Sequence, residues 1–196
     1  MSTSRTDVPP PSNWNIANAL TGFRLLLVPI FGWLLLASDG TSSTLSIGAC
    51  AVFILAAATD RFDGDLARRR GLVTDVGKLA DPIADKALTG TAFVGLSVLG
   101  QLPWWVTIVV LVREAGITLL RFWVLRHGVI AASHGGKLKT VLQSFALALY
   151  ILPLPQSLTW VAVVVMGMAV VATVVTGADY VVRALALRRA AEPAQL

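Results

Sequence analysis

Residues 60–85 read DRFDGDLARRRGLVTDVGKLADPIAD, and apolar runs flank this stretch on both sides. Eight of its positions form the pattern D-x2-D-G-x2-A-R-x8-G-x3-D-x3-D, whose four aspartates are Asp60, Asp63, Asp81 and Asp85. A carboxylate at the edge of a bilayer is costly unless a cation or a hydrogen-bonding partner neutralises it. The stretch therefore predicts two membrane helices that meet at a bound metal.

The composition of the chain is that of an integral membrane protein. Its 196 residues are 56% hydrophobic and 14% charged, with a mean hydropathy of +0.74, whereas charged residues make up about 25% of soluble domains. Most of its apolar runs approach the roughly 20 residues with which an α-helix crosses a bilayer. The runs lie at 20–37, 45–59, 79–99, 104–124, 141–154 and 158–178. The sequence predicts an all-α, polytopic membrane protein with six transmembrane helices.

The loops between the predicted helices are short, which forces neighbouring helices to lie antiparallel in one bundle. The loops at 38–43, 100–103 and 153–156 contain no Lys or Arg, and the 16 cations fall on the opposite side or inside a span near it. The positive-inside rule then places both termini in the cytoplasm of a multi-pass plasma-membrane protein. A short interfacial helix is expected at 13–18, with Trp14 at headgroup depth.

One domain is expected at 13–189, between a flexible cytoplasmic tail at 1–12 and a second tail at 190–196. The first eighteen residues are polar and lack the pattern of a cleavable signal. The formal net charge of +5 requires no nucleic-acid partner, because a basic cytoplasmic face also meets anionic headgroups. The single Cys50 lies in an apolar run and is expected to be a small core residue.

The four aspartates form two pairs on adjacent predicted helices. Members of the first pair are three residues apart and members of the second are four apart, so each pair shares one helix face. The stretch 68–75 is expected to be the cytoplasmic turn that places both pairs near the inner membrane surface. Carboxylates are hard ligands suited to Mg²⁺ or Mn²⁺, and four negative charges balance two divalent ions. A network of salt bridges between the helices is the alternative, and it leaves costly charges in the membrane.

Small residues separate the carboxylates. Gly64 and Ala67 follow the first pair by one turn, and Gly77 precedes the second pair by one turn. The helix faces that carry the aspartates therefore lack bulky side chains at these positions and leave room for a large ligand. Arg68 is placed to meet a diphosphate through its charged fork. The segment predicts a site for a phosphorylated ligand.

All eight positions match the signature of the CDP-alcohol phosphotransferase family, and the chain resembles this family over residues 15–143. Its members are membrane enzymes that join a CDP-linked lipid or alcohol to an acceptor hydroxyl. The resemblance implies two divalent ions held by the four aspartates, with Asp85 also acting as general base, and a homodimer. It further implies that the CDP group is bound by Asn18, Thr21, Gly64, Ala67, Arg68, Thr74 and Gly77.

Three further stretches are similar to the bacterial phosphatidylglycerophosphate synthase branch of this family. They are NIANALTGFR at 15–24, REAGITLLR at 113–121 and GKLKTVLQ at 136–143. Two departures are Ala17, where that branch has proline, and GKLA at 77–80, where G-x-F-L is common. The resemblance implies that a phosphatidyl group passes from CDP-diacylglycerol to glycerol 3-phosphate, giving phosphatidylglycerophosphate and CMP.

Cations on the fourth and fifth predicted helices are candidates for binding a phosphate on the acceptor. Arg113 and Arg121 are eight residues apart, about two helical turns, so they share one face. Lys137 and Lys139 begin the fifth helix on the same side of the membrane. Pairing of Glu114 with Arg113 is an alternative that leaves only the lysines for the ligand. Anchoring at the cytoplasmic surface is the alternative for the two lysines.

Other polar residues are expected to have structural or surface roles. His127 and His134 belong to one predicted loop and lack the spacing of a zinc site. Asp179 is expected to pair with Arg183, one helical turn further on.

Several rival functions are compatible with parts of the pattern. Inositol phosphate, or phosphatidylglycerol as in cardiolipin synthesis, is an alternative acceptor for the same chemistry. The four cations favour a phosphorylated acceptor over free serine or inositol. A divalent-cation transporter would need polar residues leading to the outer side, and a non-catalytic scaffold would leave four costly carboxylates unexplained.

Overall fold

The computed structural model describes the backbone of residues 16–70, 75–124 and 134–191, and the side chains of 18–59, 80–120 and 136–187. Within these ranges the chain is entirely helical and contains no strand. The helices are α1 (Ile16–Ala37), α2 (Ser43–Arg70), α3 (Asp75–Val98), α4 (Trp104–Val124), α5 (His134–Ile151), the 3-10 helix η1 (Gln156–Leu158) and α6 (Thr159–Ala191). The predicted all-α fold is confirmed for the described part of the chain.

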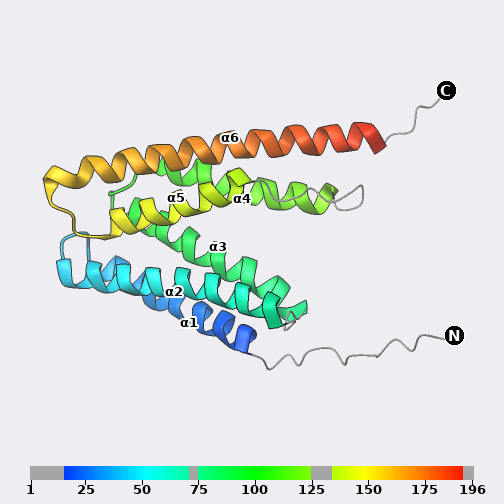
Figure 1. Cartoon of the computed structure of the whole chain (residues 1–196). Coiled ribbons are helices and arrows are strands. Elements are labelled where there is room, and N and C mark those ends of the chain that lie inside the picture. The colour runs from blue at the N-terminus through cyan, green and yellow to red at the C-terminus, as the bar shows by residue number, and fades with distance from the viewer. Residues whose placement is uncertain (1–15, 71–74, 125–133, 192–196) are drawn as a thin grey trace.

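Successive α-helices run in opposite directions (Figure 1). The starts of α1, α3 and α5 therefore lie at the same end of the bundle as the last turns of α2, α4 and α6. We call this end, where α2 carries the first aspartate pair and α3 the second, the aspartate end. Helix α1 packs against α2 and α3, whereas α6 packs against α4 and α5, and contacts of α5 with α2 and α3 join the two groups.

Short turns at the opposite end permit this antiparallel packing. Asp39 and Gly40 have φ values of 48° and 66°, and Gly100 has a φ of 69°. This left-handed conformation is free of steric cost for glycine, which allows the chain to reverse directly after a helix. The Ser38 hydroxyl stabilises the end of α1 by donating a hydrogen bond to the Leu35 carbonyl, at 2.6 Å. The turns lie where the sequence predicted the short outer loops.

The core consists of apolar side chains contributed by every long helix. Phe31 of α1 and Phe53 of α2 are fully buried, with ring centroids 5.5 Å apart. Phe93 and Leu96 of α3 and Leu147 of α5 join them in the same cluster. Such burial between helices holds the bundle together and fixes the positions of the polar residues at the aspartate end.

The outer surface of the bundle is also apolar. Two segments, Asn18–Ala37 and Gln156–Leu187, are long and apolar enough to cross a membrane, and only 28% of the apolar window in each is buried. Exposed side chains on them include Leu26, Trp33 and Trp160. A core helix of a soluble protein would be mostly covered, so these two helices have the character of membrane-spanning segments.

Three predicted boundaries differ from the structure. Helix α2 extends to Arg70 and α3 begins at Asp75, so 68–70 are helical and the turn expected at 68–75 is shorter. Residues 16–18 form the first turn of α1 and do not belong to a separate helix, while 13–15 lie outside the described residues. His134 begins α5, whereas the sequence placed it in a loop with His127, which is also outside the described residues.

Helix α6 is longer than the span predicted at 158–178. Its 33 residues correspond to about 50 Å of helix, which exceeds the roughly 30 Å thickness of a hydrocarbon core. The last turns extend past the neighbouring helices at the aspartate end (Figure 1). Asp179 pairs there with Arg183, at 2.9 Å between Oδ2 and Nε, which confirms the predicted pair.

Candidate active site

The two aspartate pairs belong to two helices that pack against each other at the aspartate end. Asp60 and Asp63 lie in the last three turns of α2, while Asp81 and Asp85 lie in the first three turns of α3. The side chains of the first pair are outside the described set, and no group of three or more potential metal ligands occurs within that set. The predicted four-carboxylate metal site therefore stays a prediction.

Asp81 is held by the first helix. The buried Thr21 hydroxyl of α1 donates a hydrogen bond to the Asp81 carboxylate of α3. The resemblance implied that Thr21 contacts CDP, whereas its described contact is this carboxylate, which it orients for any ligand. Carboxylate oxygens on adjacent turns of α3, at Asp81 and Asp85, are the hard donors that suit Mg²⁺ or Mn²⁺.

Arg24 is a second link from α1, and the sequence reasoning treated it only as part of a motif. It is fully buried, and its Nε donates a hydrogen bond to the Ala56 carbonyl of α2, at 3.2 Å. An arginine inside an apolar run is costly without partners. The position of Arg24 in such a run could therefore have indicated that it binds another helix. Thr21 and Arg24 lie one turn apart and tie α1 to both helices that carry aspartates.

Most residues implied to bind CDP have no described side chain. Gly64, Ala67 and Arg68 are helical residues of α2, and Gly77 is helical in α3. Thr74 is outside the described residues, and Asn18 is partly buried in the first turn of α1. Their roles in binding CDP remain predictions.

A cluster of charged side chains joins α4, α5 and α6 beside Asp85. The Glu114 carboxylate accepts a hydrogen bond from Arg113 Nη1, at 2.9 Å. The same oxygen, Oε1, pairs with the ammonium of Lys139. Lys139 is buried, and its charge also interacts with that of Asp85 on α3. We call Arg113, Glu114 and Lys139 the charged cluster.

The structure decides between the alternatives for the acceptor cations. Glu114 pairs with Arg113, as the alternative interpretation held, but it pairs with Lys139 as well. Lys137 is exposed on α5, and the side chain of Arg121 lies outside the described set. Arg113 and Lys139 are therefore the two predicted acceptor cations that the described side chains bring together, and the charge of Lys139 interacts with that of Asp85.

The guanidinium of Arg113 is fixed on its far side by α6. Its Nη2 donates a hydrogen bond to the Thr176 hydroxyl, at 3.0 Å. A Cβ atom added to Gly177 would lie 3.2 Å from Arg113 Cγ and 3.3 Å from Nε, so the arginine would have to shift by a few tenths of an ångström. Within the described part of the chain, the buried Nε has no hydrogen-bond partner. The contact between Arg113 and Thr176 could not be predicted from the sequence, because the two residues are 63 positions apart.

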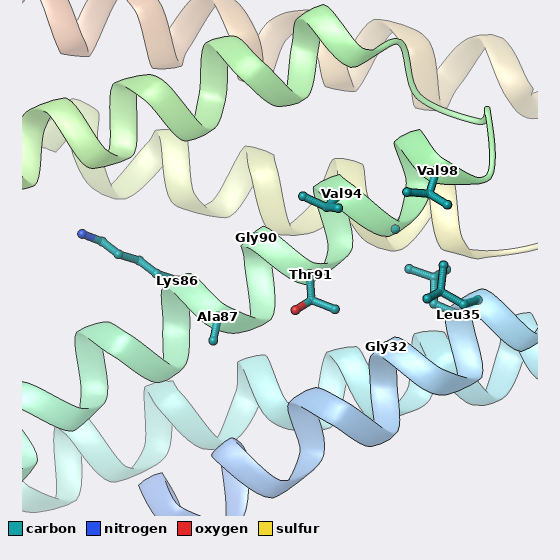
Figure 2. Close-up of a pocket in the computed structure, with 10 residues that line it drawn as sticks. Gly32, Leu35, Lys86, Ala87, Gly90, Thr91, Val94 and Val98 are labelled. Atoms are coloured by element: carbon teal, nitrogen blue, oxygen red, sulfur yellow. The ribbon is translucent and has the colours of Figure 1, made fainter.

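An apolar groove of about 430 Å³ lies between α1 and α3. Figure 2 shows Thr91 pointing toward α1 and Lys86 extending from one end of the groove. The Lys86 ammonium pairs with the Thr118 hydroxyl of α4. Gly90 and Gly95 form part of the wall, so the groove depends on small residues along α3.

Two minor predictions are tested by the core. Cys50 is a buried free thiol, as expected. Gln143, which belongs to one of the motif stretches, is buried and donates a hydrogen bond to Thr173 of α6, at 2.9 Å. It thus links α5 to α6 one helical turn after Lys139 of the charged cluster.

The chain is similar to known proteins along most of its length. A protein of Mycobacterium tuberculosis (strain H37Rv) named probable phosphatidylglycerophosphate synthase is 54% identical over 171 residues, which cover 87% of this chain and 82% of the relative. A Bacillus subtilis (strain 168) protein named CDP-diacylglycerol–glycerol-3-phosphate 3-phosphatidyltransferase is 35% identical over 180 residues, 85% of this chain and 93% of the relative. A Shigella flexneri protein of the same name is 39% identical over 169 residues, 83% and 89% of the two chains.

The resemblance seen in the motifs thus extends along most of the chain, and it includes α1, the aspartate helices and the helices of the charged cluster. Because residues 14–175 match the model of the CDP-alcohol phosphatidyltransferase family, the chain belongs to this family.

Proposed function

We propose that this protein transfers a phosphatidyl group from CDP-diacylglycerol to glycerol 3-phosphate and releases phosphatidylglycerophosphate and CMP. The observation that carries the proposal is the pairing of Arg113 and Lys139 on one oxygen of Glu114, together with the charge interaction between Lys139 and Asp85. Cations suited to bind a phosphate on the acceptor thus belong to the same end of the bundle as an acidic residue suited to activate its hydroxyl. The names of the relatives state the same donor and acceptor.

In the proposed reaction, the acceptor hydroxyl attacks the phosphorus that carries the diacylglycerol. Asp85 takes the proton from this hydroxyl, the new phosphorus–oxygen bond forms, and the bond to the CMP oxygen breaks. Arg113 and Lys139 hold the acceptor phosphate, and Arg121 and Lys137 add positive charge on the same side. Thr21 keeps the Asp81 carboxylate in its orientation.

Asp60, Asp63, Asp81 and Asp85 would hold two divalent ions, Mg²⁺ or Mn²⁺. When bound, these ions neutralise negative charge on the diphosphate and on departing CMP. The Thr21-supported carboxylate on α3 and the hard-oxygen chemistry of the four side chains fit such ions. The CDP group would be bound at the aspartate end by Asn18, Thr21, Gly64, Ala67, Arg68, Thr74 and Gly77 of α1, α2, α3 and the segment between α2 and α3.

We further propose that all six α-helices cross the plasma membrane, with both termini and the aspartate end in the cytoplasm, and that two copies form a homodimer. The apolar outer surface and the two long apolar segments support the membrane assignment. The even number of antiparallel helices and the cations near one side support the orientation. The lipid donor would then reach the site laterally from the inner leaflet, and the polar acceptor would come from the cytoplasm.

Release of CMP by the purified protein tests the function. We expect release from CDP-diacylglycerol with glycerol 3-phosphate, and little release with inositol phosphate, phosphatidylglycerol, serine or inositol. Chelation of divalent ions should stop the reaction, and added Mg²⁺ or Mn²⁺ should restore it. Release that is faster with another acceptor would reassign the substrate, and full activity in excess chelator would remove the ions from the proposal.

A further inference from the structure

The Glu114 carboxylate occupies the place where an anionic ligand of Arg113 and Lys139 would bind. One oxygen, Oε1, accepts hydrogen bonds from both cations. The Glu114 side chain is 27% exposed, whereas those of Arg113 and Lys139 are 17% and 6% exposed. Glu114 therefore has the most exposed side chain of the charged cluster, and the side chains of the two cations are more buried.

Both cations have other partners that would keep them in place without Glu114. Arg113 donates to Thr176 at 3.0 Å and lies against Gly177 of α6. Lys139 is buried in the bundle and interacts with the negative charge of Asp85. Departure of the carboxylate would thus expose a preformed pair of cations and would leave their positions largely unchanged.

A phosphate monoester is suited to replace this carboxylate. It carries between one and a half and two negative charges near neutral pH and offers three strong acceptor oxygens, according to the values for phosphorylated side chains. The guanidinium fork of Arg113 can bind two of these oxygens. An uncharged polyol has neither property, so it cannot compensate for the separation of Glu114 from two buried cations.

We propose that Glu114 is an internal competitor that occupies the Arg113–Lys139 pair until the phosphate of the acceptor displaces it. The carboxylate keeps the two cations paired before the acceptor binds, and the phosphate compensates for its displacement by pairing with both cations. This inference rests on the proposed function and adds the step by which the acceptor phosphate reaches its two cations.

The test compares wild-type protein with Glu114→Gln, which keeps the size of the side chain and removes its charge. Inorganic phosphate serves as a competitive probe while glycerol 3-phosphate is varied and CMP release is followed. We expect the inhibition constant of phosphate and the KM of glycerol 3-phosphate both to fall about tenfold, as for loss of one charged hydrogen-bond competitor. The kcat should change little, and the preference for glycerol 3-phosphate over glycerol should widen, because only the phosphorylated acceptor competes with the carboxylate for the two cations.

Two matched variants separate this effect from a general change in charge. Asp179→Asn removes an acidic partner of Arg183 on the exposed surface of α6. It should leave unchanged the inhibition constant of phosphate, the KM of glycerol 3-phosphate, the kcat and the preference over glycerol. The double variant Glu114→Gln/Lys139→Gln should show none of the gain over Lys139→Gln alone, because the cation for which the carboxylate competes is absent.

A rise in KM and in the inhibition constant for Glu114→Gln would overturn the inference, since it would show that the carboxylate holds the cations for the ligand. If Glu114→Gln does not fold, Glu114→Asp provides the test, because the shorter side chain withdraws the carboxylate from the cations. A lower inhibition constant of phosphate in Glu114→Asp supports displacement of the carboxylate, and an unchanged or higher one overturns the inference. Calorimetry can also measure the binding of inorganic phosphate to wild type and variant without any turnover. If wild type releases no CMP, the proposed function is contradicted, but the calorimetric comparison still tests the role of Glu114.

Discussion

Single polar contacts at the aspartate end connect residues that are far apart in sequence. Thr21 reaches Asp81 across 60 positions, and Lys139 lies 25 positions from Glu114. Each contact joins two helices, and each neutralises or orients a group that would be costly alone in an apolar bundle. The chemistry of the site therefore depends on pairs, and substitution of one member should also alter its partner.

Asp85→Asn tests the general base. The amide is nearly the same size as the carboxylate but cannot accept the hydroxyl proton, and loss of a catalytic base typically costs about 10²- to 10⁴-fold in rate. We expect kcat to fall by about a thousandfold or more. Helical content measured by circular dichroism should stay at the wild-type level, and near-normal turnover would remove Asp85 from the mechanism.

Thr21→Val tests the support of Asp81 by α1. Valine has the shape of threonine and lacks the hydroxyl that donates to the carboxylate, and a hydrogen bond to a charged group is worth about 1.5–3 kcal/mol. We expect roughly a tenfold loss of activity in the CMP-release assay. Thr21→Ser keeps the donor and should retain most of the activity, so equal loss in both variants would argue against a role for the hydrogen bond.

At the scale of the helices, small residues determine how closely α1 approaches α3. Gly32 of α1 lies against Thr91, where an added Cβ would be 3.1 Å from Cγ2, and Gly95 of α3 lies against Leu35 of α1. Close approach of backbones is a common basis of helix association in membranes, because lipid offers no hydrophobic driving force between helices. This contact positions Thr21 against Asp81, so packing in the outer half of the bundle supports the site.

Gly95→Ala should weaken this contact. The added Cβ would lie 2.6 Å from Leu35 Cδ2 in the buried core, and overpacking of this kind costs about 1–3 kcal/mol. Gly90→Ala is the matched control on the same helix, because its Cβ would meet Leu111 at an ordinary 3.9 Å. We expect a lower thermal unfolding midpoint for Gly95→Ala and an unchanged or slightly higher one for Gly90→Ala. Equal midpoints for the two variants would contradict the close packing.

At the scale of the whole molecule, the antiparallel order of six α-helices places the start of α1 and the end of α6 on the same side (Figure 1). Basic residues lie near that side, and the turns at the other end, 38–42 and 99–103, contain none. A membrane protein built in this way should have both termini in the cytoplasm.

Reporter fusions test this orientation. A cytoplasm-active reporter should be active when fused after residue 196 and inactive when inserted at Gly40 or Gly100, which lie in turns at the far end. An export-dependent reporter should give the reverse result at the same three positions. Activity of the first reporter at Gly40 would show that the bundle is inverted or that α1 does not cross the membrane.

The sequence pattern was sufficient to predict the helices and the positions of the aspartates on them. Apolar runs and glycine-containing turns depend on local chain properties, so the turns at 38–43 and 100–103 were predicted almost to the residue. The boundary at 68–75 was predicted less well, because polar residues that read as a turn continue α2 to Arg70. Helix formation there follows from propagation of an existing helix, which local polarity does not reveal.

The sequence by itself determined that the chain is helical, that it is apolar enough for a membrane, and that its aspartates and cations gather at one end of the helices. Only the tertiary structure decided which charges pair there: Glu114 with both Arg113 and Lys139, and Thr21 with Asp81. The physical reason is that spacing along a chain defines the face of one helix, whereas contacts between faces depend on how all the helices pack.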